Sequence, residues 1–343
     1  MKQLLISIVL LISVSGASAN DSIARVATGG ITFTKSTDIR MLEEVLQIST
    51  KTVRVKYRFL NESDQDVHAT VAFPMPTYGW NAGVSASDAN VGPVTTFNVL
   101  VNGRHLSTTT HRKAMIGDRD VTDRLRKLGL SDEQILDTFG GCRIENLGGI
   151  VSDLTADQKK AIDLLWAKNG KFPQWKVAAT VLWEQTFPAG KEVIVEHSYT
   201  PFVGKIYTVP YQKQKKYTYI SPDILPAPYK QNNPKEACID EGTRQTIQNR
   251  INSYVAKGAK NITVWRDDVE YILATGRNWK GPIGEFRLLV EKDTADQIIS
   301  LCFPDKPREI NSKTYEFVHR NFVPQDTLVV YFYKVTSDRE AKK

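Results

Sequence analysis

The chain has 343 residues, of which 41% are hydrophobic and 24% are charged. This balance is typical of a folded globular protein and excludes an intrinsically disordered one. The formal net charge of +7 is modest for this length. It permits contact with an anionic surface but does not require one, and we predict no nucleic-acid partner.

The first 19 residues have the features of a secretory signal. Lys2 supplies a positive start, residues 4–14 are almost entirely apolar, and Ala17 and Ala19 are small residues of the kind that a signal peptidase reads. The apolar stretch is too short to span a bilayer, and no later stretch is apolar enough to do so. We expect cleavage before Asn20 and a periplasmic or secreted protein without a transmembrane span.

Alternating patterns predict strands in the first half of the chain. Apolar and basic residues alternate over 53–59, which indicates a strand with one buried face. Further strands are expected at 67–73, 177–187 and 193–199. Residues 96–101 and 104–110 are expected to pair around the turn Asn102-Gly103. Together these strands predict a β-sandwich-like domain over residues 20–205.

Helical patterns interrupt this domain. Capping boxes begin at Ser131 and Thr155, and glycines at 140 and 170 follow the two predicted helices. We therefore predict a helical insertion at about residues 117–173.

A second domain is predicted after a proline-rich stretch. Six prolines lie between residues 201 and 234, and proline hinders strand pairing, so residues 206–237 are interpreted as a connector. Asp240 can cap a helix that carries Ile247 and Ile251 on one stripe. Strands are expected at 264–274, 285–291, 314–322 and 328–333. The fold class is thus mainly β with helical insertions (α+β), with a C-terminal α+β domain at 238–337 and a tail at 338–343.

Three cysteines are present, and an oxidising compartment makes a disulfide available. An odd count leaves one thiol over, and three pairings are open. Cys238 and Cys302 both lie in the C-terminal third, which favours that pair. Cys142 lies in a glycine-flanked turn. No CxxC motif is present, which argues against a redox-active or zinc site.

No catalytic, metal or cofactor motif stands out. The five histidines, at positions 68, 105, 111, 197 and 319, do not have the spacing of metal ligands. His197 shares a strand face with Val195 and Tyr199, so we interpret it as a core or rim residue. We predict no metal, no cofactor and no catalytic residue.

Acidic pairs offer a rival interpretation. Asp268 and Glu270 would share a strand face, beside Asp267, and Glu43-Glu44 is another pair. Paired carboxylates can hydrolyse glycosidic bonds, so an envelope hydrolase is the alternative function. We favour a solvated strand face, because no sequence feature shows a pocket that would perturb a pKa.

Two segments are candidate binding surfaces. Tyr217 and Tyr219 lie among lysines in residues 207–219, which suits an anionic lipid or polysaccharide surface but also suits an edge hairpin protected by its lysines. The loop at 275–284 holds Arg277, Asn278, Trp279 and Lys280. It is either a tightly specified turn or a recognition surface.

A set of short stretches along the chain forms a familiar pattern: residues 20–22, 28–30, 53–59, Asn61, 71–76, 183–189, 196–201, 272–288, Cys302 and 322–324. In these stretches the chain resembles a bacterial family of exported proteins known as domain of unknown function 4424. The resemblance implies no established activity, and it supports the pairing of Cys238 with Cys302. The N-terminal part also looks like the domain shared by vault proteins and inter-alpha-trypsin inhibitors.

These features predict a non-enzymatic protein that binds or assembles an envelope component. That partner is a protein, a glycan or an anionic lipid surface.

Overall fold

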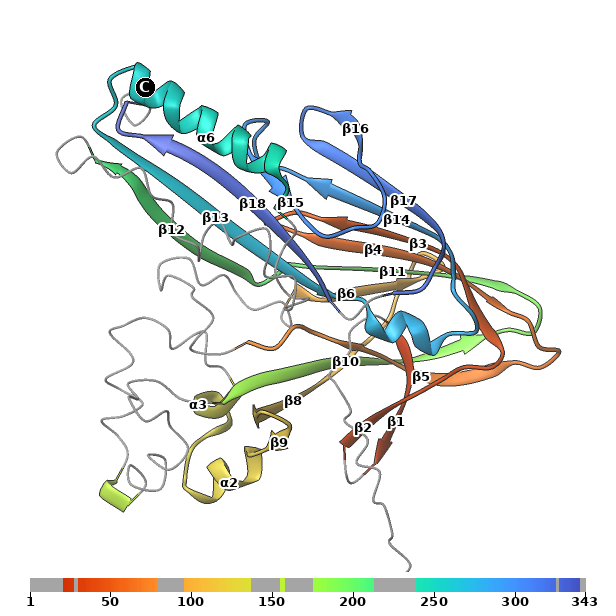
Figure 1. Ribbon diagram of the computed structural model, residues 1–343. Coiled ribbons are helices and arrows are strands. Elements are labelled where there is room, and N and C mark those ends of the chain that lie inside the picture. The colour runs from red at the N-terminus through yellow and green to blue at the C-terminus, as the bar shows by residue number, and fades with distance from the viewer. Residues whose placement is uncertain are drawn as a thin grey trace, which may run out of the picture.

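The computed structural model describes residues 21–27, 30–78, 96–136, 155–157, 175–212, 239–324 and 327–339. These residues form three β-sheets with few helices (Figure 1). The predicted fold class, mainly β with helical insertions, is confirmed. Within the described ranges, no helix is long and apolar enough to cross a membrane. The leader lies outside them.

The largest sheet has eight strands in the order β16-β17-β14-β3-β4-β11-β6-β7. In chain order they are β3 (Ile39–Ile48), β4 (Val53–Asn61), β6 (Asn98–Val101), β7 (Arg104–His105), β11 (Glu192–Tyr199), β14 (Ile283–Glu291), β16 (Arg308–Asn311) and β17 (Thr314–Phe322). The alternation predicted for residues 53–59 is confirmed, since Val55 and Tyr57 are buried while Arg54 and Lys56 are exposed. β4 therefore turns apolar side chains to the core and basic ones to water.

A second sheet has six strands in the order β2-β1-β5-β10-β8-β9. They are β1 (Ser22–Ala27), β2 (Gly30–Thr34), β5 (Val67–Pro74), β8 (Thr109–Ile116), β9 (Arg119–Asp120) and β10 (Lys176–Phe187). The single return strand predicted at 104–110 is wrong. β7 closes the hairpin with β6, and the chain then crosses to the second sheet, where β8 pairs with β10.

The third sheet has four strands in the order β12-β13-β18-β15. They are β12 (Val203–Gln212), β13 (Asn261–Ile272), β15 (Ile298–Ser300) and β18 (Thr327–Ser337). Helix α6 (Glu241–Ala256) lies along this sheet (Figure 1). Its predicted cap is confirmed, because Asp240 Oδ1 accepts a hydrogen bond of 2.6 Å from the Thr243 amide. A short 3₁₀-helix, η2 (Ala274–Asn278), follows β13.

One hydrophobic core joins the three sheets. It includes Tyr57 of the eight-stranded sheet, Phe73 and Val181 of the six-stranded sheet, and Val269 and Phe332 of the four-stranded sheet. A smaller core lies between α6 and the four-stranded sheet, where Ile247 and Ile251 meet Ile262 and Tyr333. The inner face of the eight-stranded sheet is thus covered, which leaves the charged face for solvent.

The two predicted domains share one sheet. β14 pairs in parallel with β3, so strands from residues 238–337 complete the sheet that residues 20–205 begin. The predicted boundary therefore does not divide the sheets. Its connector is also partly regular, since β12 pairs with β13 and shifts register between Thr208 and Tyr211, around Pro210. Residues 213–237 of the connector lie outside the described ranges.

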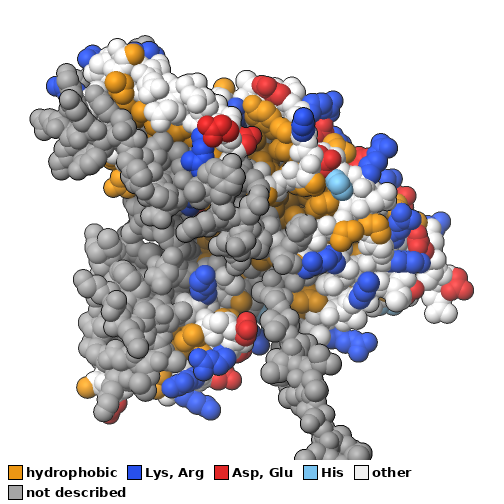
Figure 2. Space-filling model, viewed as in Figure 1, with side chains coloured by type: hydrophobic (Ala, Val, Ile, Leu, Met, Phe, Trp, Pro, Cys, Tyr) orange, Lys and Arg blue, Asp and Glu red, His pale blue; other side chains and the backbone are white. Residues whose placement is uncertain are grey.

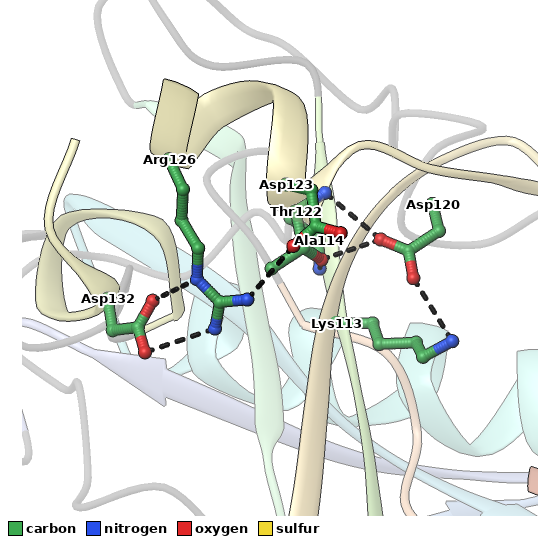
Figure 3. Close-up of polar contacts among 7 residues, drawn as sticks. All are labelled: Lys113, Ala114, Asp120, Thr122, Asp123, Arg126 and Asp132. Carbon is green, nitrogen blue, oxygen red and sulfur yellow. Dashed lines mark hydrogen bonds and ion pairs between the residues drawn. The ribbon is translucent and has the colours of Figure 1, made fainter. Parts of the chain in front are cut away.

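Two short helices stand beside β8 and β9 at the start of the predicted insertion. They are α2 (Thr122–Lys127) and α3 (Asp132–Leu136). Figure 3 shows how polar contacts hold them: Asp120 accepts from Thr122 and pairs with Lys113, and Arg126 pairs with Asp132 at 2.7 Å. α3 lies within the helix predicted to begin at Ser131, and the extent of the insertion stays a prediction. Of residues 137–173, the structure describes only 155–157, so the second helix stays a prediction.

Charged side chains of both signs lie on the face of the molecule that Figure 2 draws. On its described part, acidic groups lie among the lysines and arginines. The net positive charge is therefore not gathered into one basic patch on this face.

Candidate functional site

Trp279, the centre of the predicted recognition loop, is a core residue. Its side chain is only 1% exposed, and its ring lies 4.5 Å from Phe59 and 5.9 Å from Phe187, centroid to centroid. Its Nε1 donates a hydrogen bond of 2.6 Å to the backbone carbonyl of Asp21. A ring in this position cannot stack on a ligand at the surface, so the prediction that Trp279 binds a ligand is wrong.

The neighbours of Trp279 also make contacts within the fold. Asn278 Nδ2 donates to Ser22 Oγ at 3.0 Å, and Arg277 Nε donates to a carbonyl of η2 at 3.3 Å. Lys280 Nζ lies 2.8 Å from Glu62 Oε2. This contact lowers the pKa of the Glu62 carboxyl below its ordinary value. The loop thus connects β1 and the end of β4 to η2. Of the two predicted roles, these contacts fit a tightly specified turn and not a recognition surface.

The other candidate segments are only partly described. Tyr217, Tyr219, Cys142 and Cys238 lie outside the described residues. Cys302 is described and lies at the surface between β15 and β16. Its pairing with Cys238 stays a prediction.

The fold gives Asp268 a basic neighbour and separates Glu43 from Glu44. Asp268 lies 3.6 Å from Arg266, and burial raises the pKa of its carboxyl. Glu43 and Glu44 point to opposite faces of β3: Glu43 pairs with Arg58 at 3.6 Å, while Glu44 is fully buried beside the Tyr271 hydroxyl. The hydrolase that would use Asp268 and Glu270 stays the alternative function.

His197 lies in the core, as its strand face predicts. Its Nε2 is 3.2 Å from Asp21 Oδ1, and both side chains are fully buried. Burial raises the pKa of the Asp21 carboxyl, although His197 acts against this. No group of three or more potential metal ligands occurs among the described residues.

A hollow on the outer face of the eight-stranded sheet is the candidate site. It has a volume of about 320 Å³ and is lined by side chains from β3, β4, β6 and β11. The strand register explains its shape. Arg54 lies opposite Gln47 on one side and the short Ser198 on the other, and Lys56 lies between Val45 and Glu196. Short side chains between long ones leave a depression with a firm backbone floor.

Arg54 differs from the other basic residues of this face. Lys56 pairs with Glu196 at 3.3 Å, Arg58 with Glu43 and Glu192, Arg287 with Glu316, and Arg320 with Glu285. Within the described residues, the Arg54 side chain has no carboxylate at ion-pair distance and no hydrogen-bond partner. It is exposed at the rim of the hollow. The hollow therefore offers a charged donor group that the fold does not use.

The comparisons with known proteins give a family but no activity. The family model for a domain of unknown function, DUF4424, matches residues 19–331. The chain belongs to the DUF4424 family. No curated protein matches. Among solved structures, the chain is similar to a "putative nutrient binding protein" from Legionella pneumophila, with 16% identity and a TM-score of 0.42 over 92% of this chain and 70% of that one. The likeness to vault and inter-alpha-trypsin domains stays a prediction.

Sequence reasoning missed the residues of this hollow. The alternation over 53–59 places Arg54 and Lys56 on the outer face, which is the signal that the sequence offers. Which cation keeps a free charge depends on the strands beside it. The neighbours Gln47 and Ser198 come from β3 and β11, far apart in sequence.

Proposed function

We propose that this DUF4424 protein is a non-enzymatic binding module of the cell envelope that holds its ligand in the hollow on the outer face of the eight-stranded sheet. The observation that carries the proposal is Arg54, a basic side chain at the rim of a hollow of about 320 Å³ without an acidic partner among the described residues. Ligand sites in proteins are typically concave, mainly preformed and equipped with a few polar groups.

The floor of the hollow is rigid, which supports a role in binding. Four adjacent strands form it, and Val55 and His197 turn their side chains into the core beneath. The side chains around the hollow are held as well, since Gln47 Nε2 donates to Glu291 at 2.6 Å and Lys56 pairs with Glu196. A site on a rigid scaffold loses little conformational entropy when a ligand binds.

We also propose that the protein is exported from the cytoplasm. The leader motivates it, and the position of Asp21 and Ser22 supports it, because these residues are buried in the fold directly after the proposed cleavage point. N-terminal sequencing of periplasmic or secreted material should begin at or near Asn20. A protein that retains its first 19 residues in the membrane would contradict the export proposal.

Filling the hollow tests the binding proposal. Ser198→Trp places a large ring in the hollow, and Ser312→Trp makes the same change at an exposed turn of the β16–β17 hairpin. A panel of envelope glycans, amino acids, organic acids and lipid vesicles should contain a component that binds the wild type and the Ser312→Trp variant. The Ser198→Trp variant should lose it. Equal binding by all three proteins, or binding by none, would overturn the proposal.

A further inference from the structure

The charge balance of the hollow favours an anion. Arg54 and Lys56 lie two residues apart on the same face of β4, and Glu196 is the carboxylate of the lining. Lys56 and Glu196 neutralise each other at 3.3 Å, so one positive charge remains, that of Arg54. An anionic ligand would pair with Arg54 as the carboxylates of the fold pair with Lys56 and Arg58.

The neighbours of Arg54 cannot neutralise it. Its cross-strand partners are the neutral Gln47 and Ser198, and the nearest cation on its own strand face is Lys56. The Gln47 amide is already bonded to Glu291. The guanidinium therefore has donors available for an outside acceptor, and its fork matches carboxylate and phosphate oxygens.

The hollow also has apolar walls. Val45 on β3 and Leu100 on β6 stand on either side of the two central strands, and both are half-buried. They lie opposite Lys56 and Glu196, respectively, so apolar surface flanks the neutralised pair. A ligand that fits both features carries an apolar body next to its charged group.

We propose that the ligand is an amphipathic anion, in which a carboxylate or phosphate ester contacts Arg54 and an apolar body covers Val45 and Leu100. This inference rests on the proposed function of the hollow. Two kinds of molecule combine an anionic group with an apolar body in this way: a small organic acid in solution and an anionic lipid with its headgroup.

Calorimetric titration separates the requirements of charge and apolar body. The probes are octanoate and octyl phosphate, with octyl glucoside as the neutral match and acetate as the match without an apolar body, all below their micelle concentrations. Arg54→Gln removes the proposed contact, Arg54→Lys keeps the charge without the fork, and Arg320→Gln removes the same charge from a distant part of the sheet.

We expect octanoate or octyl phosphate to bind the wild type and the Arg320→Gln variant alike. Arg54→Gln should weaken this binding about tenfold or more, as the loss of a charge-assisted hydrogen bond does, and Arg54→Lys should weaken it less. Leu100→Ser should reduce the preference for octanoate over acetate. Vesicles of phosphatidylglycerol and phosphatidylcholine then separate the sources: binding to the anionic vesicle alone indicates a lipid headgroup, and binding to the soluble acids alone indicates a free metabolite.

The results separate a failure of the anion proposal from a failure of the proposed binding function. If octyl glucoside binds as well as octanoate and Arg54→Gln has no effect, the ligand is not an anion, and the proposal is overturned while the binding function stands. If no probe binds and the wider panel shows no difference between Ser198→Trp and the wild type, the proposed function fails with it.

Discussion

Trp279 is a residue whose role could not be predicted from its neighbours in the sequence. In the sequence it stands among Arg, Asn, Lys and glycines, a setting shared by recognition loops and specified turns. In the fold its ring packs between Phe59 and Phe187, and its indole nitrogen holds the first described residue, Asp21. The surrounding residues come from three other segments, so the local sequence could not separate the two roles.

Replacing Trp279 by Ala should therefore destabilise the protein. The change removes a fully packed ring and leaves the Asp21 carbonyl without its donor, and core Trp→Ala substitutions cost about 3–5 kcal/mol. Trp279→Phe keeps an aromatic ring and should cost less. Urea unfolding measures both. An unchanged midpoint for Trp279→Ala would contradict the core assignment.

Glu316 should make stability depend on pH. Hydrogen bonds from Arg287, at 2.6 Å, and from Arg308 lower the pKa of its carboxyl below the ordinary value of 4.5. A lowered pKa in the folded state adds stability above the ordinary pKa, and that stability is lost as the pH falls through the lowered value. Glu316→Gln should cost about 1–2 kcal/mol at neutral pH, because the arginines are partly exposed and screened.

The gap between the wild type and Glu316→Gln should shrink on acidification to about pH 3. Urea unfolding at the two pH values measures it. Glu285→Gln, which breaks the more exposed pair with Arg320, is the matched control and should cost less at neutral pH. A gap of constant size across the pH range would show that the carboxylate charge is not what matters.

Among the elements, several strands are located closely by their alternating or apolar patterns. β4, β5, β11, β14 and β17 are confirmed with boundaries shifted by at most two residues. β3 has no such signal. Its sequence IRMLEEVLQI is rich in residues that favour helices, and a register shift between Met41 and Glu43 interrupts the alternation. Pairing with β4 and β14 decides its conformation.

The parallel pairing of β3 and β14 requires a glycine. A Cβ at Gly284 would lie 2.5 Å from the carbonyl oxygen of Leu42, which is backbone and cannot turn away. Gly284→Ala should therefore lower the melting temperature, and Gly284→Val should lower it further. Gly242→Ala, in the first turn of α6, meets only ordinary contact at 3.4 Å and should leave the melting temperature unchanged or raised.

Thermal unfolding of these variants measures the effect. Gly281→Val is a second test, because φ is +71° at Gly281 and a β-branched residue is strained in that conformation. Unchanged melting temperatures for both the Gly284 and the Gly281 variants would show that the close approach and the turn are tolerant.

At the scale of the whole molecule, sequence reasoning fails where distant segments combine. Prolines at 201–234 suggest a boundary, yet β14, β16 and β17 belong to the sheet begun by β3 and β4. Local patterns reveal which residues form strands but not which strands become neighbours. The hollow was missed for the same reason, because its four lining strands meet only in the folded sheet.

The predicted disulfide would join two segments that lie far apart in the sequence. If Cys238 and Cys302 are paired, the bridge ties the entry of α6 to the segment after β15. Such a long loop adds roughly 4 kcal/mol in the chain-entropy model. Peptide mapping without reductant should give one linked peptide containing Cys238 and Cys302, with Cys142 outside it. A peptide linking Cys142 to either of them within one chain would refute the pairing.

We propose that the outer face of the eight-stranded sheet binds an anionic ligand at Arg54. A crystal structure of the mature protein grown with octanoate would show whether it does. We expect electron density for a carboxylate against the Arg54 guanidinium, with the alkyl chain against Val45 or Leu100. Density for octanoate elsewhere, with the hollow empty and Arg54 bonded to another part of the protein, would refute the proposal.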